Sequence, residues 1–486
     1  MDTVTEPGRQ VPVAGRYDVV VAGGGVAGVF AALGAARQGA RTALVERFGS
    51  VGGNIGPGMI VNGHMISGRA HDRVWYECTV YPRLYGLGKE FVDRYAELGG
   101  GSIPPLRPTH YPWDASIASY VAQQMLEESG VALHVSTAVA DPILEGTRVR
   151  GLFVEGKSGR RALTAKVVVD ATGEADLARR AGAPVLYPKP EYHEIDGHAP
   201  TGMGLFYLVG GIDWEAFDRA AAGPALSAEE VAWARQHLDE GVAERQPHLV
   251  RPLRRAAAQG ESPPRGSVRL GDAEVGISVG SITRLPSPGL GQGRAAPARL
   301  GPIDAGDAGH IAALETAQRA RIFENVLFYR RWVPGFADAC LLCIAPFLGV
   351  RGGPCIAGEY TLTMDDCRAG RRFPDVLYLY GEFRALRHTA EQGQPLWVDF
   401  PYRTMLPKGL DGLLAVGRSA SGTPDTLLRN RMAAKVMGQA GGVAAALAAA
   451  ADLGPKELDV GQLQAALLDA GFYLGDRHRL KELGLV

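Results

Sequence analysis

Three glycines, Gly23, Gly25 and Gly28, are spaced as GxGxxG directly after the apolar run 19–22. Each has a physical task at a strand-to-helix turn: Gly23 makes the turn, Gly25 lets a ligand approach the backbone, and Gly28 lets helix pack on strand. The free N–H groups at the start of the following helix favour an anion, so a diphosphate suits this position. The alternative is a turn without any ligand.

An acidic residue stands where such a turn needs one. Glu46 lies 21 positions after Gly25, at the end of a second apolar run, where a carboxylate can bind a ribose 2′-hydroxyl. A strand before the glycines, a helix after them and this carboxylate together predict a dinucleotide site. Val26 and Ala27 belong to the same turn and are expected contacts.

Four further segments resemble motifs of FAD proteins. ERFGSVGGN (46–54) resembles the stretch that follows the ribityl chain toward the flavin in glutathione-reductase-type proteins. VVVDATGEADLARRAGA (167–183) resembles the second FAD fingerprint, and LLAVGRSASG (413–422) resembles the third. MGQAGGVAAALA (437–448) resembles the helix whose N-terminal turn faces the flavin pyrimidine. The chain therefore resembles the FAD-dependent oxidoreductases related to the fumarate reductase and succinate dehydrogenase flavoproteins.

This resemblance implies FAD as the cofactor and an α/β fold. The Rossmann-like FAD-binding domain has a parallel sheet assembled from separated segments, and an α+β substrate domain is inserted. The expected limits are a leader at 1–16, the FAD-binding domain at 17–56, 115–185 and 400–452, the substrate or cap domain at 57–114 and 186–399, and a C-terminal helical segment at 453–486. The expected FAD contacts are Gly23, Gly25, Val26, Ala27, Gly28, Glu46, Arg47, Gly53, Asn54, Val139, Ala171, Thr172, Gly173, Gly417, Arg418, Gly438, Gln439 and Ala440.

Candidate catalytic groups lie in the last third of the chain: Arg351, Arg431, Tyr402, Arg403 and His388, with Arg429 beside them. An arginine fork near a flavin could clamp a substrate carboxylate or stabilise an anionic reduced flavin. A tyrosine or histidine could move a proton. Each has a structural alternative, since an arginine can bridge domains and a tyrosine can pack in the core. Arg351 and Arg431 are favoured because they match the pattern of the resembled family.

The chain is predicted to be an FAD-dependent dehydrogenase or reductase that transfers hydride between the flavin and a small organic metabolite. Carboxylated metabolites are among the candidate substrates. No second GxGxxG joins a strand to a helix, because the glycines at 289–293 stand in the stretch 284–302, which is predicted to be a long loop. A separate NAD(P)H domain is therefore not expected. Two alternatives stay open: an O₂-using flavin monooxygenase or oxidase, and a non-catalytic FAD-binding scaffold or sensor with partner surfaces on loops at 249–302.

The composition of the chain limits the classes of binding partner and the cellular location that we expect. The formal net charge of −1 does not favour nucleic acid or an acidic membrane. Five cysteines fit a reducing, cytoplasmic location, and the closest pair, Cys340 and Cys343 in ACLLCIAP, is predicted to be buried and chemically quiet. No metal site is expected, because YHEIDGH (192–198) lacks HExxH spacing. The electron acceptor and a homo-oligomer stay open.

Two helical expectations and one histidine complete the prediction. A helix is predicted to follow Asp307 and to end at Pro334-Gly335. The alanine-rich run near residue 450 is judged too short to span a bilayer. His64 follows the flavin-approaching segment and is interpreted as a loop or core residue.

Overall fold

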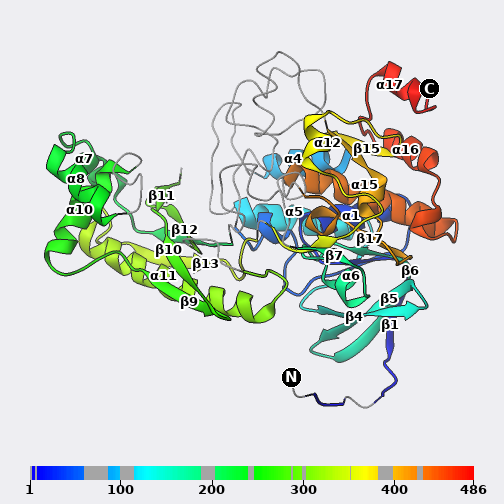
Figure 1. Cartoon of the computed structure of the whole chain (residues 1–486), viewed down its shortest axis with the longest axis horizontal. Helices are drawn as coiled ribbons and strands as arrows, with labels where there is room; N and C mark the ends of the chain where they lie inside the picture. The colour runs from blue at the N-terminus through cyan, green and yellow to red at the C-terminus, as the bar shows by residue number, and fades with distance from the viewer. Residues whose placement is uncertain are drawn as a thin grey trace.

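The computed structural model describes residues 3–5, 8–59, 86–98, 114–187, 203–238, 246–285, 288–297, 303–350, 352–380, 398–423 and 431–486. Two lobes are visible in Figure 1. The lobe on the left contains the green segments up to β13, and the lobe on the right contains the N-terminal and C-terminal segments of the chain, with the two termini far apart. We name them after the roles that the sequence predicts for their segments, the substrate lobe and the FAD lobe.

A parallel sheet organises the FAD lobe. Its strands, in the order β3-β2-β1-β6 with β17 beside β6, are β3 (Ala132–His134), β2 (Thr42–Val45), β1 (Val13–Ala22), β6 (Gly159–Asp170) and β17 (Leu413–Ala415). On the edge away from β1, the first half of β6 pairs antiparallel with β5 (Arg148–Gly156), and β5 pairs antiparallel with β4 (Ala138–Glu145). The valine-rich carboxyl ends of β1 and β6 (19–22 and 167–169) are fully buried, as expected for a sheet covered on both faces.

Two glycine- and alanine-rich helices, α1 (Val26–Arg37) and α15 (Arg431–Ala450), pack against this sheet and against each other. A Cβ atom on Gly34 would lie 2.6 Å from the Gln439 carbonyl oxygen, so only glycine allows this approach. The window Ala433–Ala450 is long and apolar enough to cross a membrane, longer than the alanine-rich run suggested, yet 89% of it is buried inside the protein. It serves as the core helix of the FAD lobe.

An antiparallel sheet organises the substrate lobe, in the order β13-β8-β12-β10-β9 with β11 beside β12. Its strands are β8 (Leu205–Gly210), β9 (Gly266–Leu270), β10 (Ala273–Val279), β11 (Thr283–Arg284), β12 (Gly291–Pro297) and β13 (Cys340–Ile344). Helix α11 (Ala308–Trp332), capped by Asp307, lies along one face of this sheet (Figure 1). The helix predicted after Asp307 is therefore confirmed.

The remaining elements are shorter. They are α4 (Gly86–Glu97), α5 (Asp114–Glu128), α6 (Asp176–Arg180), β7 (Val185–Leu186), α7 (Trp214–Ala221), α8 (Ala228–His237), α10 (Pro247–Ala258), β14 (Cys355–Ile356), α12 (Met364–Arg368), β15 (Val376–Tyr380), β16 (Val398–Pro401), α16 (Val460–Asp469) and α17 (Arg477–Glu482). Together with the sheets they confirm the α/β class with an inserted α+β unit.

The buried apolar side chains form separate hydrophobic cores in the two lobes. The core of the substrate lobe is drawn from residues 203–348. Leu362, Phe373 and Tyr378, which the sequence analysis assigned to the inserted domain, pack with α1 and α15 in the FAD lobe. The domain limits themselves stay predictions.

Two local predictions are wrong. The stretch 284–302 is not one long loop, because β12 lies within it at the centre of the sheet. Its glycines make room for rings: Tyr207 covers Gly293, and a Cβ there would overlap that ring. Cys340 and Cys343 are exposed, because β13 is an edge strand that turns Leu341 toward the core.

Candidate functional site: an FAD cradle

The glycine turn has the geometry that a diphosphate requires. Gly23 has φ +102°, and a Cβ there would lie 2.6 Å from the Ala171 carbonyl oxygen. A Cβ on Gly28 would overlap the Gly23 carbonyl oxygen, so the helix packs directly on the turn. A Cβ on Gly25 would meet nothing within 4 Å. The backbone around Gly25 is thus tightly built on the protein side and open on the ligand side.

Glu46 lies beside this turn and is only 7% exposed. Its Oε2 accepts from Gly24 N–H at 2.8 Å, and its Oε1 accepts from Phe48 N–H at 2.9 Å. Burial raises the pKa of the Glu46 carboxyl, and these two backbone donors act in the opposite direction. Each carboxylate oxygen has a further lone pair, so Glu46 can also accept from a ribose hydroxyl.

The segment after Glu46 runs back over the turn. Gly53 has φ +51°, and a Cβ there would lie 2.8 Å from Gly25 Cα. Arg47 is exposed, with its guanidinium 4.8 Å from the centre of the Phe48 ring. Phe48 stacks on Phe347 of the substrate lobe at 4.7 Å. This segment therefore contacts both lobes, and Asn54 lies within it.

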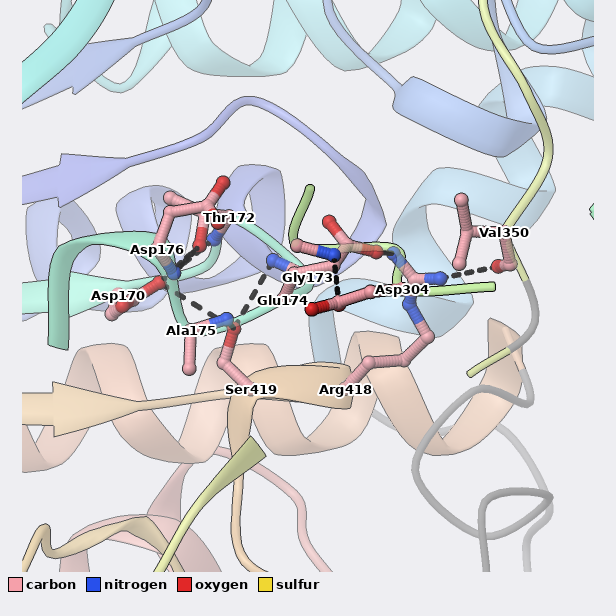
Figure 2. Close-up of polar contacts among 11 residues, drawn as sticks. Asp170, Thr172, Gly173, Glu174, Ala175, Asp176, Asp304, Val350, Arg418 and Ser419 are labelled. Atoms are coloured by element: carbon pink, nitrogen blue, oxygen red, sulfur yellow. Dashed lines mark hydrogen bonds and ion pairs between the residues drawn. The ribbon is translucent and has the colours of Figure 1, made fainter. Parts of the chain in front are cut away.

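The carboxyl end of β6 supplies a polar network (Figure 2). Asp170 is fully buried and accepts from Thr172 Oγ1 at 2.7 Å and from Ala178 N–H at 2.9 Å. Burial raises its pKa, while these donors lower it. Ser419 Oγ accepts from the N–H groups of Gly173 and Ala175, both at 3.1 Å. The second and third fingerprint segments are thereby held together.

Arg418 joins three segments (Figure 2). Its Nη2 lies 2.5 Å from Glu174 Oε1, its Nη1 donates to the Val350 carbonyl oxygen, and both charged side chains are largely buried. Gly173, with φ +96°, lies so close to this guanidinium that a side chain would not fit. Burial raises the pKa of Glu174, and Arg418 lowers it. Arg418 thus links the FAD lobe to Val350, in the chain segment that follows β13 of the substrate lobe.

The predicted contacts from α15 lie deeper. Gly438 packs on the Ala27 carbonyl oxygen, Gln439 Oε1 accepts from Leu87 N–H at 3.0 Å, and Ala440 is fully buried. Because α15 begins at Arg431, these residues lie about two turns into the helix and not in its N-terminal turn, contrary to the sequence interpretation. Their role as cofactor contacts stays a prediction. So does that of Val139, whose carbonyl oxygen accepts from Arg180.

The catalytic candidates have mixed outcomes. Arg351, His388, Arg429 and His64 lie outside the described residues, and of Arg431 only the backbone is described. Tyr402 is 2% exposed and donates to the Pro455 carbonyl oxygen at 2.8 Å, and burial raises its pKa. Arg403 Nε lies 2.9 Å from Asp375 Oδ2, and its guanidinium lies 5.3 Å from the ring centre of Tyr360. Both side chains already have partners in the protein, as the structural alternative expected.

The sequence interpretation missed Glu174, Ser419 and Met59. A usable signal existed for the first two, because Glu174 and Ser419 follow the ends of neighbouring parallel strands, which meet at one edge of a sheet. Met59 has φ +54°, accepts from Gln292 Nε2 at 3.2 Å and lies beside Cys343. No local pattern predicts these contacts, since they join residues more than 200 positions apart.

A metal centre is not evident within the described part of the chain, where no three His, Cys, Asp or Glu side chains gather. The segment 192–198 lies outside it. By contrast, the open space at Gly25, the buried Glu46 and the left-handed glycines 53, 173 and 417 fit a dinucleotide. When bound, FAD would supply the electron chemistry, and these residues would hold it.

Comparisons with known proteins agree with this site. A family model described as FAD dependent oxidoreductase matches residues 18–467. Digeranylgeranylglycerophospholipid reductase from Methanoculleus marisnigri is 26% identical over 202 residues, which are 40% of this chain and 49% of that protein. The match thus spans about half the length of this curated relative.

Two solved structures are similar at low sequence identity. A geranylgeranyl bacteriochlorophyll reductase-like protein from Thermoplasma acidophilum is 14% identical, with a TM-score of 0.39 over 94% of this chain and 84% of that one. A triple mutant of the flavin-dependent brominase Bmp2 is 14% identical, with a TM-score of 0.40 over 93% of this chain and 84% of that one.

The family model covers nearly the whole chain. The chain therefore belongs to the FAD-dependent oxidoreductase family, and it is an enzyme that uses FAD. The closer kinship with fumarate reductase and succinate dehydrogenase flavoproteins stays a prediction, as does the cytoplasmic location.

Proposed function

We propose that this enzyme is a dehydrogenase or reductase that exchanges hydride between FAD and a small organic metabolite. The observation that carries the proposal is the set of chain segments that converge on the glycine turn: the end of β1, the segment 46–59, the end of β6 and the start of the third fingerprint. Gly52 N–H donates to the Gly24 carbonyl oxygen at 2.8 Å, and Gly417 lies against Ala27. This convergence supports one dinucleotide with its flavin directed along residues 53–59.

The residues around this cradle have defined tasks in the proposal. The N–H groups near Gly25 and the start of α1 bind the diphosphate. Glu46 orients the adenosine ribose, and its burial keeps water away from that contact. Arg418, paired with Glu174, holds the carbonyl group of Val350 beside the ends of β6 and β17. FAD supplies the electron chemistry when bound.

Two further observations favour a dehydrogenase or reductase over the alternatives. The curated relative with the matched half is named a reductase. The second observation concerns the scaffold alternative, which assumed extended loops at 249–302: the described residues of this range include most of the helix α10 and the strands β9 to β12. The alternative with O₂ is an outcome of the test below.

The experiment is anaerobic reduction of the purified protein by candidate metabolites. The protein should copurify with FAD, and a substrate should bleach the flavin band at about 450 nm. Protein that refuses FAD, or flavin that every metabolite and chemical reductant leaves oxidised, would contradict the proposal. Product formation only in the presence of O₂, with oxygen incorporated into the product, would instead establish the monooxygenase alternative.

A further inference from the structure

A short segment that follows β13, residues 345–350, joins the two lobes, and we call it the bridging segment. Ala345 N–H donates to the Phe206 carbonyl oxygen at 2.8 Å, and Gly349 N–H donates to the Gly204 carbonyl oxygen at 2.9 Å. The backbone of the bridging segment is therefore fixed to β8 and to the residue just before it, on the side of the substrate lobe.

Two residues of the bridging segment contact the FAD lobe. Phe347 stacks on Phe48, with the ring centres 4.7 Å apart. A Cβ atom on Gly58 would lie 3.1 Å from the same Phe347 ring. Further along, the Val350 carbonyl oxygen accepts from Arg418 Nη1 (Figure 2). The bridging segment is thus attached at one point to the stretch after β2 and at another to the third fingerprint, after β17.

The order of the strands shows what lies between these two points. In the parallel sheet β1 lies between β2 and β6, and β17 pairs with the end of β6. The carboxyl ends of parallel strands meet at one edge of the sheet, so the bridging segment passes the carboxyl end of β1, where the glycine turn begins. It does not fill the turn, since a Cβ atom on Gly25 would meet nothing within 4 Å.

Two charged side chains of α11 hold the backbone of the bridging segment. Glu315 Oε1 accepts from Leu348 N–H at 3.0 Å. Arg319 Nη2 donates to the carbonyl oxygens of Ala345 and Pro346, at 3.2 Å and 2.9 Å. The same Nη2 lies 4.0 Å from Glu315 Oε2, one helical turn away. Hydrogen bonds from ionised side chains are stronger than neutral ones, so this pair fixes the position of the segment.

We infer that Glu315 and Arg319 are positioning residues that slow the release of FAD, because they hold the bridging segment across the glycine turn that binds the cofactor. The inference goes beyond the proposed function, since it concerns retention of FAD and not the reaction of the flavin, and it rests on the placement of FAD on this turn. FAD that leaves the turn has to displace the bridging segment. Loss of the anchors should therefore act mainly on the dissociation rate.

The test measures the rate constant of FAD dissociation from the loaded protein, by the fluorescence of the flavin released on dilution. Arg319→Met keeps the apolar stem and removes the donors. It should raise this rate constant at least about tenfold and change the association rate constant by no more than about threefold. Arg319→Lys keeps a cation that can donate to the same carbonyl oxygens and should give a smaller increase.

Glu315 separates the hydrogen bond from the charge. Glu315→Ala removes the acceptor of Leu348 N–H and should speed FAD dissociation. Glu315→Gln keeps an acceptor oxygen at this position and should speed it less. Phe347→Leu weakens the stack on Phe48 and should also speed dissociation. Its effect should not add fully to that of Arg319→Met, because both variants act through one segment.

Arg321→Met is the matched control on the same helix. Arg321 lies 2.6 Å from Glu324 and donates to the Arg265 carbonyl oxygen at 3.0 Å, so it holds a different backbone segment. Its loss should leave FAD dissociation unchanged, and thermal unfolding of the apo proteins establishes that each variant is folded. Equal dissociation rates in the wild type, Arg319→Met and Glu315→Ala would overturn the inference, as would an equal increase in Arg321→Met. A loaded wild-type protein whose flavin no metabolite reduces would contradict the proposed function alone.

Discussion

The two lobes differ in how they meet a ligand. In the FAD lobe, the predicted ligand contacts are largely backbone: the N–H groups at the start of α1, and glycines such as Gly23 and Gly28, where a side chain would overlap the protein itself. In the substrate lobe, by contrast, the glycines of β12 make room for rings of the protein itself, as Gly293 does for Tyr207. A cofactor bound by backbone leaves a fingerprint in sequence, whereas glycines that pack against the protein's own rings leave almost none.

The largest effect is expected from a substitution at Gly28, where the backbone of the FAD lobe leaves no space for a side chain. A Cβ there would overlap the Gly23 carbonyl oxygen and press on Ala171. Because both neighbours belong to the central sheet and its turn, Gly28→Ala should cost about 3 kcal/mol or more of unfolding free energy and abolish FAD binding. Urea unfolding and flavin content measure the two effects. Gly39→Ala is a useful control, since Gly39 has φ +85° but open space around it, and it should lose stability without losing FAD affinity.

Glu174→Gln tests the connection between the lobes. The side chains of Glu174 and Arg418 are 13% and 17% exposed, so the variant leaves a largely buried guanidinium without its carboxylate. We expect a loss of about 2 to 4 kcal/mol in unfolding free energy. The control is Glu359→Gln, which removes the more exposed partner of Lys456 and should cost no more than about 1 kcal/mol. Equal costs for the two variants would mean that the Glu174–Arg418 pair does not hold the lobes.

The pH dependence of FAD affinity sharpens the role of Glu46. Burial raises its pKa above the ordinary value of 4.5, so the carboxylate becomes protonated at a higher pH than an exposed one. FAD affinity should fall as the pH is lowered toward that range. The stability of the apo protein depends on pH in the opposite direction. The stabilisation that follows from the raised pKa of Glu46 is present below pH 4.5 and is lost as the pH rises through the raised pKa.

Glu46→Gln separates these trends. The variant should bind FAD about tenfold more weakly at neutral pH, because a charge-assisted hydrogen bond is lost. The Glu46-dependent part of the pH profile should disappear, which fluorescence titration of FAD between pH 4.5 and neutrality can show. A profile identical to that of the wild type would assign the titration to Asp170 or Glu174, whose pKa values burial also raises.

The smallest effect is expected at the edge strand β13. Cys340 and Cys343 are exposed, while Cys355 and Cys367 are buried. Native protein should therefore react rapidly with a thiol reagent at Cys340 and Cys343, and at Cys355 and Cys367 only after unfolding. Cys340→Ser should remove one fast thiol and change stability by no more than about 0.5 kcal/mol. The fifth cysteine, Cys78, lies outside the described residues, so the comparison is between variants: a number of fast-reacting thiols that is the same in the wild type and in the Cys340→Ser/Cys343→Ser double variant would contradict the exposed placement.

Particular residues show how far sequence reasoning reaches. The turn at Gly23 to Gly28 and the helix after Asp307 were predictable, because steric demand and capping are local. The strand β12 was missed, since its glycines serve rings elsewhere in the chain, and the exposure of Cys340 depends on which strand lies at the edge. Arg418 and Glu174 are 244 positions apart in the chain. Only the order of the strands in the sheet, with β17 beside β6, indicates that these two side chains meet.

The most direct test of the account is FAD affinity in Gly25→Ala. Gly25 has φ −71°, which alanine adopts readily, and a methyl group there would meet no protein atom within 4 Å. The apo variant should lose no more than about 1 kcal/mol of stability, because alanine is a poorer N-cap than glycine, yet it should bind FAD at least about tenfold more weakly, because the methyl group takes the space of the diphosphate. Unchanged FAD affinity in a folded Gly25→Ala protein would contradict the placement of the cofactor on this turn.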